Sequence, residues 1–136
     1  MLSPTADTIR LFLHVLAAAV WVGGQFALAG IVPTLRREAP EATRVVARAF
    51  ARVAWPAFAL VVITGLWNIA EVDVTNTDSA YQVTLMIKIT LAVLSGVFAA
   101  VHSVGRTKLA VALGGSLGGL FAIGALFFGI LLTNGG

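Results

Sequence analysis

The sequence predicts an all-α integral membrane protein, a four-helix bundle with both termini on the outer side of the membrane. Of its 136 residues 59% are hydrophobic and only 11% are charged, and the mean hydropathy is +0.97. Water-soluble domains of this size do not reach such values. Four apolar runs, at residues 11–32, 53–70, 83–101 and 109–132, are each close to the ~20 residues that cross a bilayer. We expect one transmembrane domain over residues 1–136, with helices at about 8–32, 44–70, 81–104 and 109–132.

Polar or charged residues precede each of the first two apolar runs, and each of the two helices contains or ends at a proline. The first follows the polar stretch 3–8 and should end at Pro33, because proline has no amide proton for the helix. Its apolar run is too long for the core of a signal peptide, so we expect it to stay in the membrane. Before the second run, Arg44, Arg48 and Arg52 are four residues apart and share one helix face. Pro56 then lies inside the second helix.

The last two helices follow an acidic segment and a short basic turn. Residues 71–79 are polar and acidic, and Tyr81 is placed like an interfacial aromatic residue. The turn at 105–108 leads into a helix that carries four glycines in overlapping small-xxx-small registers, namely Gly114, Gly115, Gly118 and Gly119. This pattern predicts close helix packing. Room for a flat prosthetic group and a homo-oligomer interface are the alternatives.

Basic residues set the expected orientation. The first loop and its flank carry five arginines, Arg36, Arg37, Arg44, Arg48 and Arg52, and the third loop carries Arg106 and Lys108, whereas the second loop has none. Basic loops face the cytoplasm, so we expect a multi-pass protein of the cell (inner) membrane. The basic residues are scattered, which argues against binding to nucleic acid. The absence of cysteine excludes disulfides and thiolate metal sites.

Three ionisable side chains lie within or directly beside the apolar runs: His14, Lys88 and His102. Such groups are costly in hydrocarbon and usually line an interior site. His14 should lie ~5 Å and Lys88 ~8 Å from the outer surface, so the two can be neighbours. His102 is displaced from His14 by roughly 24 Å along the bundle, which excludes a haem held by both histidines. We expect His102 to be an interfacial residue.

The chemistry of the outer half favours haem b. A neutral imidazole is a good iron ligand, which makes His14 the candidate ligand. Arg10 and Lys88 are placed to neutralise propionates. Trp21 shares the helix face of His14, and Trp67 and Asn68 lie at a matching depth of the second helix, as does Thr64. The alternatives are that His14 is a hydrogen-bonded packing residue and that Lys88 extends its amine to the interface. Copper would require softer or clustered ligands.

Short motifs add a family resemblance. They are the run from Leu13-His14 to Trp21-Val-Gly23-Gly24, Arg52-Val-Ala-Trp55-Pro56 leading to Thr64-Gly65-Leu66-Trp67, and Lys88-Ile-Thr-Leu-Ala-Val-Leu. Across about the first 100 residues they resemble the copper-resistance D (CopD) family and its relative, the HemJ-type protoporphyrinogen oxidase. The resemblance implies haem b, with His14 as an iron ligand and Lys88 as an essential residue and second ligand to the metal.

Together these observations predict a haem b-binding membrane protein of CopD/HemJ-like type. It would act in membrane electron transfer or as a small oxidoreductase, with a membrane electron carrier such as a quinone as partner. Two alternatives remain from the sequence. One is a copper-handling membrane protein in which His14 is one of few ligands. The other is a cofactor-free accessory subunit of a membrane complex.

Overall fold

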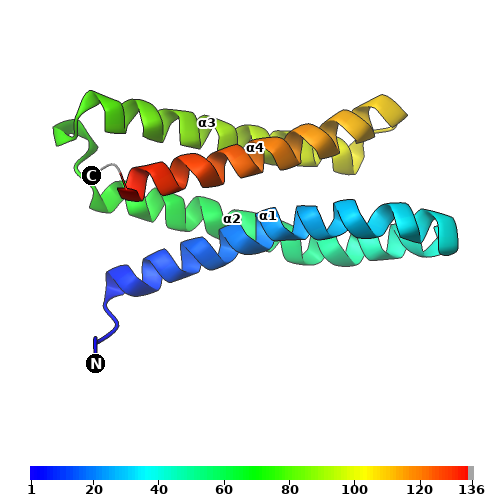
Figure 1. Ribbon diagram of the computed structural model, residues 1–136, viewed down its shortest axis with the longest axis horizontal. Coiled ribbons are helices and arrows are strands. Elements are labelled where there is room, and N and C mark those ends of the chain that lie inside the picture. The colour runs from blue at the N-terminus through cyan, green and yellow to red at the C-terminus, as the bar shows by residue number, and fades with distance from the viewer. Residues whose placement is uncertain (135–136) are drawn as a thin grey trace. The chain divides into compact units, whose positions relative to one another are not determined.

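The computed structural model describes residues 1–134, and these form four long helices (Figure 1). The helices are α1 (Ala6–Glu38), α2 (Thr43–Glu71), α3 (Ser79–Val104) and α4 (Lys108–Asn134), with short 3-10 helices at Pro40–Ala42 and Val74–Asn76. No strand occurs in this part of the chain. All four helices are long and apolar enough to cross a membrane. The predicted all-α fold class is therefore confirmed.

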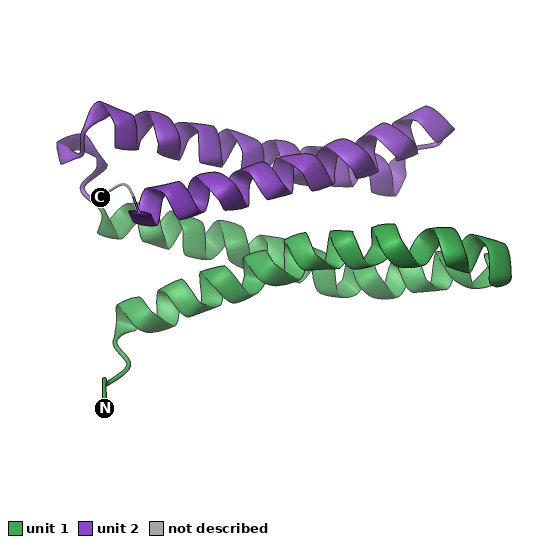
Figure 2. Ribbon diagram, in the orientation of Figure 1, with its two compact units in different colours: residues 1–72 green, residues 73–136 purple. Residues whose placement is uncertain are grey.

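The helices pair in sequence order into two compact units, coloured separately in Figure 2. The first unit is Met1–Val72, in which α1 packs against α2, and the second begins at Asp73 and contains α3 packed against α4. Each unit is a helical hairpin, because a short connection forces the second helix to run back along the first.

Helix α1 begins at a reciprocal cap and ends later than the sequence predicts. The Oγ1 of Thr5 accepts the Thr8 amide at 3.2 Å, and the Oγ1 of Thr8 accepts the Thr5 amide at 3.3 Å. The predicted end at Pro33 is wrong, since the helix continues to Glu38 with the proline inside it. Proline removes one backbone hydrogen bond. Arg36 and Arg37 in the last turn favour the continuation, because cations stabilise the negative end of a helix.

An aromatic cluster fills the middle of the first hairpin. The ring of Trp21 on α1 lies 4.6 Å from that of Phe58 and 5.6 Å from that of Trp55, measured between ring centroids. Trp21 is only 6% exposed. One turn further along α1, Gly24 leaves the space that the Phe50 ring of α2 occupies. Aromatic burial and tilted ring packing thus join the two helices between His14 and the α1–α2 connection.

The second hairpin is held by backbone contact along the glycines of α4. A Cβ at Gly114 would lie 2.6 Å from the backbone nitrogen of His102, and one at Gly118 would lie 3.2 Å from that of Ala99. The hydroxyl of Ser95, which is 1% exposed, donates to the Gly118 carbonyl at 3.0 Å. Gly114 and Gly118 therefore take part in close helix packing within the chain, the first of the interpretations of the glycine pattern.

The connection between α2 and α3 contains an ordered acidic turn. The carboxylate of Asp73 accepts hydrogen bonds from the side chains of Thr75, at 2.6 Å, and Asn76. These bonds, with that of Thr75 the stronger cause, lower the pKa of Asp73 below its ordinary value of 3.8. Asp78 then caps α3, its Oδ1 accepting the Tyr81 amide at 2.7 Å.

Candidate functional site at His14

His14 on α1 is fixed by a hydrogen bond to α2. Its Nδ1 lies 2.8 Å from the Oγ1 of Thr64. The Thr64 hydroxyl, 2% exposed, donates its own proton to the Leu60 carbonyl at 2.6 Å. Because a hydroxyl has one proton, Oγ1 accepts from Nδ1, which must carry a hydrogen. In the neutral imidazole the lone pair is then on Nε2, the nitrogen through which a histidine in this tautomer binds a metal.

Gly65 provides the space beside the imidazole. A Cβ at this position would lie 3.5 Å from Cε1 of His14, an ordinary van der Waals distance, so Gly65 lies directly beside the ring. Thr64 and Gly65 are thus both neighbours of His14, and the hydrogen bond to Thr64 orients the ring. Partners of this kind set the tautomer and direction of metal-binding histidines.

Arg10 lies one turn from His14 on α1 and is almost completely buried, with 9% exposure. Its Nη2 is 3.2 Å from Asp7, and its Nη1 is 3.9 Å from Glu71 at the end of α2. Within residues 1–134, Nε and Nη1 have no hydrogen-bond acceptor. A buried guanidinium that pairs with two carboxylates but has two nitrogens without a hydrogen bond among the described residues can still donate to a further anionic group, since guanidinium forms strong bonds to carboxylates.

The other predicted site residues of this hairpin lie in different surroundings. Asn68 is half-buried, and its Oδ1 has no hydrogen-bond partner among the described residues. Trp67 is 41% exposed and donates from Nε1 to Glu71 at 3.2 Å. Trp21 belongs to the aromatic cluster two turns from His14. The structure therefore brings Arg10 and His14 together with α2, whereas Trp67 lies on an exposed face.

Lys88 and His102 belong to the second hairpin, on the face of α3 that meets α4. The Cε and Nζ of Lys88 lie 3.4 and 3.5 Å from the position of a Cβ at Gly129. His102 donates from Nδ1 to the Val111 carbonyl at 2.6 Å. Lys88, Ser95 and His102, which follow one another on α3 at seven-residue spacing, thus all contact α4 within this hairpin. His102 itself is exposed.

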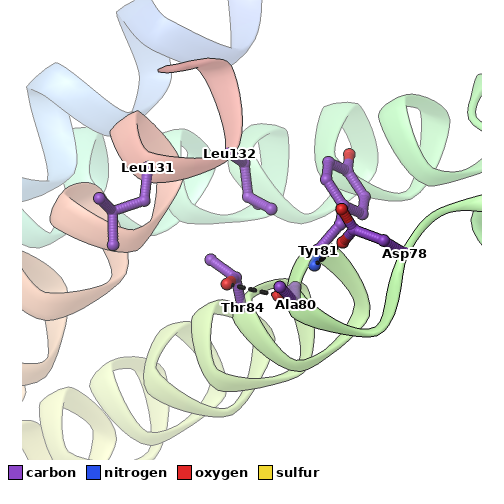
Figure 3. Close-up of a pocket in the computed structure, with 6 residues that line it drawn as sticks. All are labelled: Asp78, Ala80, Tyr81, Thr84, Leu131 and Leu132. Atoms are coloured by element: carbon purple, nitrogen blue, oxygen red, sulfur yellow. Dashed lines mark hydrogen bonds between the residues drawn. The ribbon is translucent and has the colours of Figure 1, made fainter. Parts of the chain in front are cut away.

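A small hollow lies between the start of α3 and the end of α4 (Figure 3). Its lining consists of Asp78, Ala80, Tyr81, Thr84, Leu131 and Leu132. The volume is about 220 Å³, below the ~300–1,000 Å³ of typical ligand pockets. None of the predicted site residues lines it, and the Thr84 hydroxyl is used in a bond to the Ala80 carbonyl at 2.7 Å. We do not assign a function to it.

The fold and the His14 site define a class, a multi-pass α-helical protein with a polar histidine site between two apolar helices. In the part of the chain that the structure describes, no group of three or more His, Cys, Asp or Glu side chains is placed to hold a metal ion. No protein-family model, curated protein or solved structure matches the chain.

Sequence reasoning placed Thr64 at the depth of His14 but did not assign it to the site. It also missed Gly65 and Glu71. The signal for Thr64 is a polar residue in an apolar run, level with a histidine in the neighbouring helix of an antiparallel pair. Glu71 is a weaker case, since it ends the second apolar run and is indistinguishable in sequence from other boundary charges.

Proposed function

We propose that this chain binds haem b through His14 in the outer half of the cell (inner) membrane. In this proposal it works in membrane electron transfer or as a small oxidoreductase, with a quinone as the electron carrier. The observation that supports the proposal best is the hydrogen bond from His14 to Thr64. It fixes the tautomer with the lone pair on Nε2, and haem iron takes such a neutral imidazole as axial ligand.

The residues of the first hairpin fit the remaining needs of a haem. Arg10 offers buried donors with no acceptor in the described chain, which suits the carboxylate of a propionate. The aromatic cluster of Trp21, Trp55 and Phe58 supplies apolar surroundings. When bound, haem would supply one-electron redox chemistry. The protein would hold the group, orient its histidine ligand through the hydrogen bond from His14 to Thr64, and exclude water with apolar side chains.

Haem needs only one or two protein ligands, whereas copper sites use several soft or clustered ones. Among residues 1–134 no such cluster is present, and the chain has no cysteine. The donor set around His14 therefore supports haem over copper. The second ligand to iron, for which the family resemblance points to Lys88, is part of the proposal and has its own test in the Discussion.

The test is an absorption spectrum of the purified chain, oxidised and reduced, with two histidine variants compared. The parent should show a Soret band that shifts on reduction. His14→Ala should lose most of the haem, because only apolar contacts and propionate pairing would remain. His102→Ala is the matched control and should keep both haem content and band shape. A colourless parent, or haem loss in His102→Ala alone, would overturn the proposal.

A further inference from the structure

The connecting end of the first hairpin carries a dense and unneutralised positive charge. The five arginines there, Arg36, Arg37, Arg44, Arg48 and Arg52, are all exposed. In residues 1–134 the ion pairs involve only Arg10, so none of the five is neutralised by Glu38 or Glu41 nearby. Such charge attracts anions, and its arrangement indicates which kind.

Three of these arginines form a line along α2. Arg44, Arg48 and Arg52 follow one another at four-residue spacing inside the continuous helix Thr43–Glu71, so they share a face and extend over ~12 Å. Between Arg52 and Glu71 the helix has no charged residue. That interval is ~28 Å long, which matches the ~30 Å thickness of bilayer hydrocarbon.

This match sets the depth of each arginine. With Glu71 at one boundary of the hydrocarbon, Arg52 lies at the other, and Arg48 and Arg44 follow at steps of ~6 Å. The polar headgroup layer is about 5–8 Å thick on each side of the bilayer. Arg52 and Arg48 therefore lie within reach of lipid phosphates, and Arg44, ~12 Å from the hydrocarbon, lies a few Å beyond the layer, a distance that its long side chain can span.

Apolar side chains beside the arginines distinguish a lipid surface from other anions. Val45 is 67% exposed and Val53 is 58% exposed, and they directly follow Arg44 and Arg52 in sequence. Exposed valines next to arginines suit a boundary where acyl chains and phosphates meet. A nucleic acid would instead favour a basic surface with exposed aromatic side chains for stacking. Trp55, one turn after Arg52, packs its ring on Trp21 and Phe58 instead.

We propose that the α2 face of Arg44, Arg48 and Arg52 binds anionic phospholipid headgroups. The planar guanidinium donates two parallel bonds to a phosphate, so arginine at this depth both pairs and orients the headgroup. The attraction corresponds to about fivefold in affinity per arginine near the surface, or roughly a hundredfold for the three. The binding does not depend on haem.

The test uses the full chain in lipid nanodiscs made either of phosphatidylcholine alone or of phosphatidylcholine with phosphatidylglycerol. Thermal unfolding is followed by circular dichroism at 222 nm. The parent should unfold at least ~3 °C higher with phosphatidylglycerol present, because a ligand that binds the native state stabilises it. Arg44→Gln/Arg48→Gln/Arg52→Gln should lose this difference while keeping its helical signal.

The matched control is Arg36→Gln/Arg37→Gln/Lys108→Gln, which removes the same charge from other exposed positions and should keep the shift. An equal loss in this control would mean that net charge matters and the α2 face does not. A parent with no shift would refute the proposal. Inorganic phosphate, or a short RNA, added to phosphatidylcholine discs should have no effect; stabilisation of the parent by either would assign the face to that anion instead.

Discussion

The Nδ1 of His14 and the Oγ1 of Thr64 are 2.8 Å apart, across the interface of α1 and α2. Since the Thr64 proton is committed to the Leu60 carbonyl, this contact decides which imidazole nitrogen carries hydrogen. One threonine thereby links helix packing to the chemistry of the histidine. The link can be tested separately from the presence of His14.

Thr64→Val should weaken haem retention several-fold and lower stability by about 1 kcal/mol, the typical value of a hydrogen bond between membrane helices. Valine keeps the shape of threonine but cannot accept from His14. Haem content by difference spectroscopy and unfolding of the haem-free form give the two readouts. Thr64→Ser restores the hydroxyl and should recover both. A valine variant with parental haem content would show that Thr64 does not orient the ligand.

Gly114→Ala should destabilise the second hairpin by about 1–3 kcal/mol, because a Cβ there would lie 2.6 Å from the backbone nitrogen of His102 and the helices would have to separate. The control is Gly23→Ala on α1, where nothing lies within 4 Å of the added atom. Denaturant unfolding in detergent measures both. If the two variants were equally stable, α4 would not approach α3 as closely as described.

Lys88→Met tests the proposed second ligand. A methionine thioether can replace an amine at iron, so a ligand position should give an altered spectrum that is still low-spin. A propionate partner would instead give weaker haem retention with the same band shape. We expect the altered spectrum. Parental spectrum and parental haem content together would exclude both roles and leave Lys88 as a packing residue over Gly129.

Asp73→Cys tests the predicted topology, in which both termini and the α2–α3 connection are outside while Arg37 and Lys108 are inside. An impermeant thiol reagent should label this variant in intact cells, because the chain has no other cysteine and the position is exposed. Arg37→Cys should label only after lysis. The reverse pattern would invert the protein and place the His14 site in the cytoplasmic half.

The four helices could be predicted from the sequence because each is a long apolar run, and length against bilayer thickness is a strong constraint. Helix ends were less predictable. Pro33 indicates a stop by its local chemistry, but the loss of one hydrogen bond is small beside the rest of a long helix.

The site was predictable only in part. Residue numbers alone place Thr64 at the same membrane depth as His14. In two antiparallel helices the depth of each residue follows from its distance in sequence to the helix end. Rotation about the helix axis was harder. Trp67 is three residues from Thr64 yet 41% exposed, and Lys88 lies over Gly129 of α4. Apolar residues surround these helices on all sides, so the hydrophobic pattern does not mark which face is inward.

The continuation of α1 to Glu38 also affects how readily trypsin can cleave the chain at Arg36 and Arg37. A loop over residues 34–43 would expose Arg36 and Arg37 as trypsin sites. In the structure both arginines lie in the last turn of an α-helix, and only Ala39–Ala42 separate it from α2. Trypsin needs an extended segment, so cleavage must wait for this turn to fray. The most basic end of the molecule is thus protected from the protease that recognises basic residues.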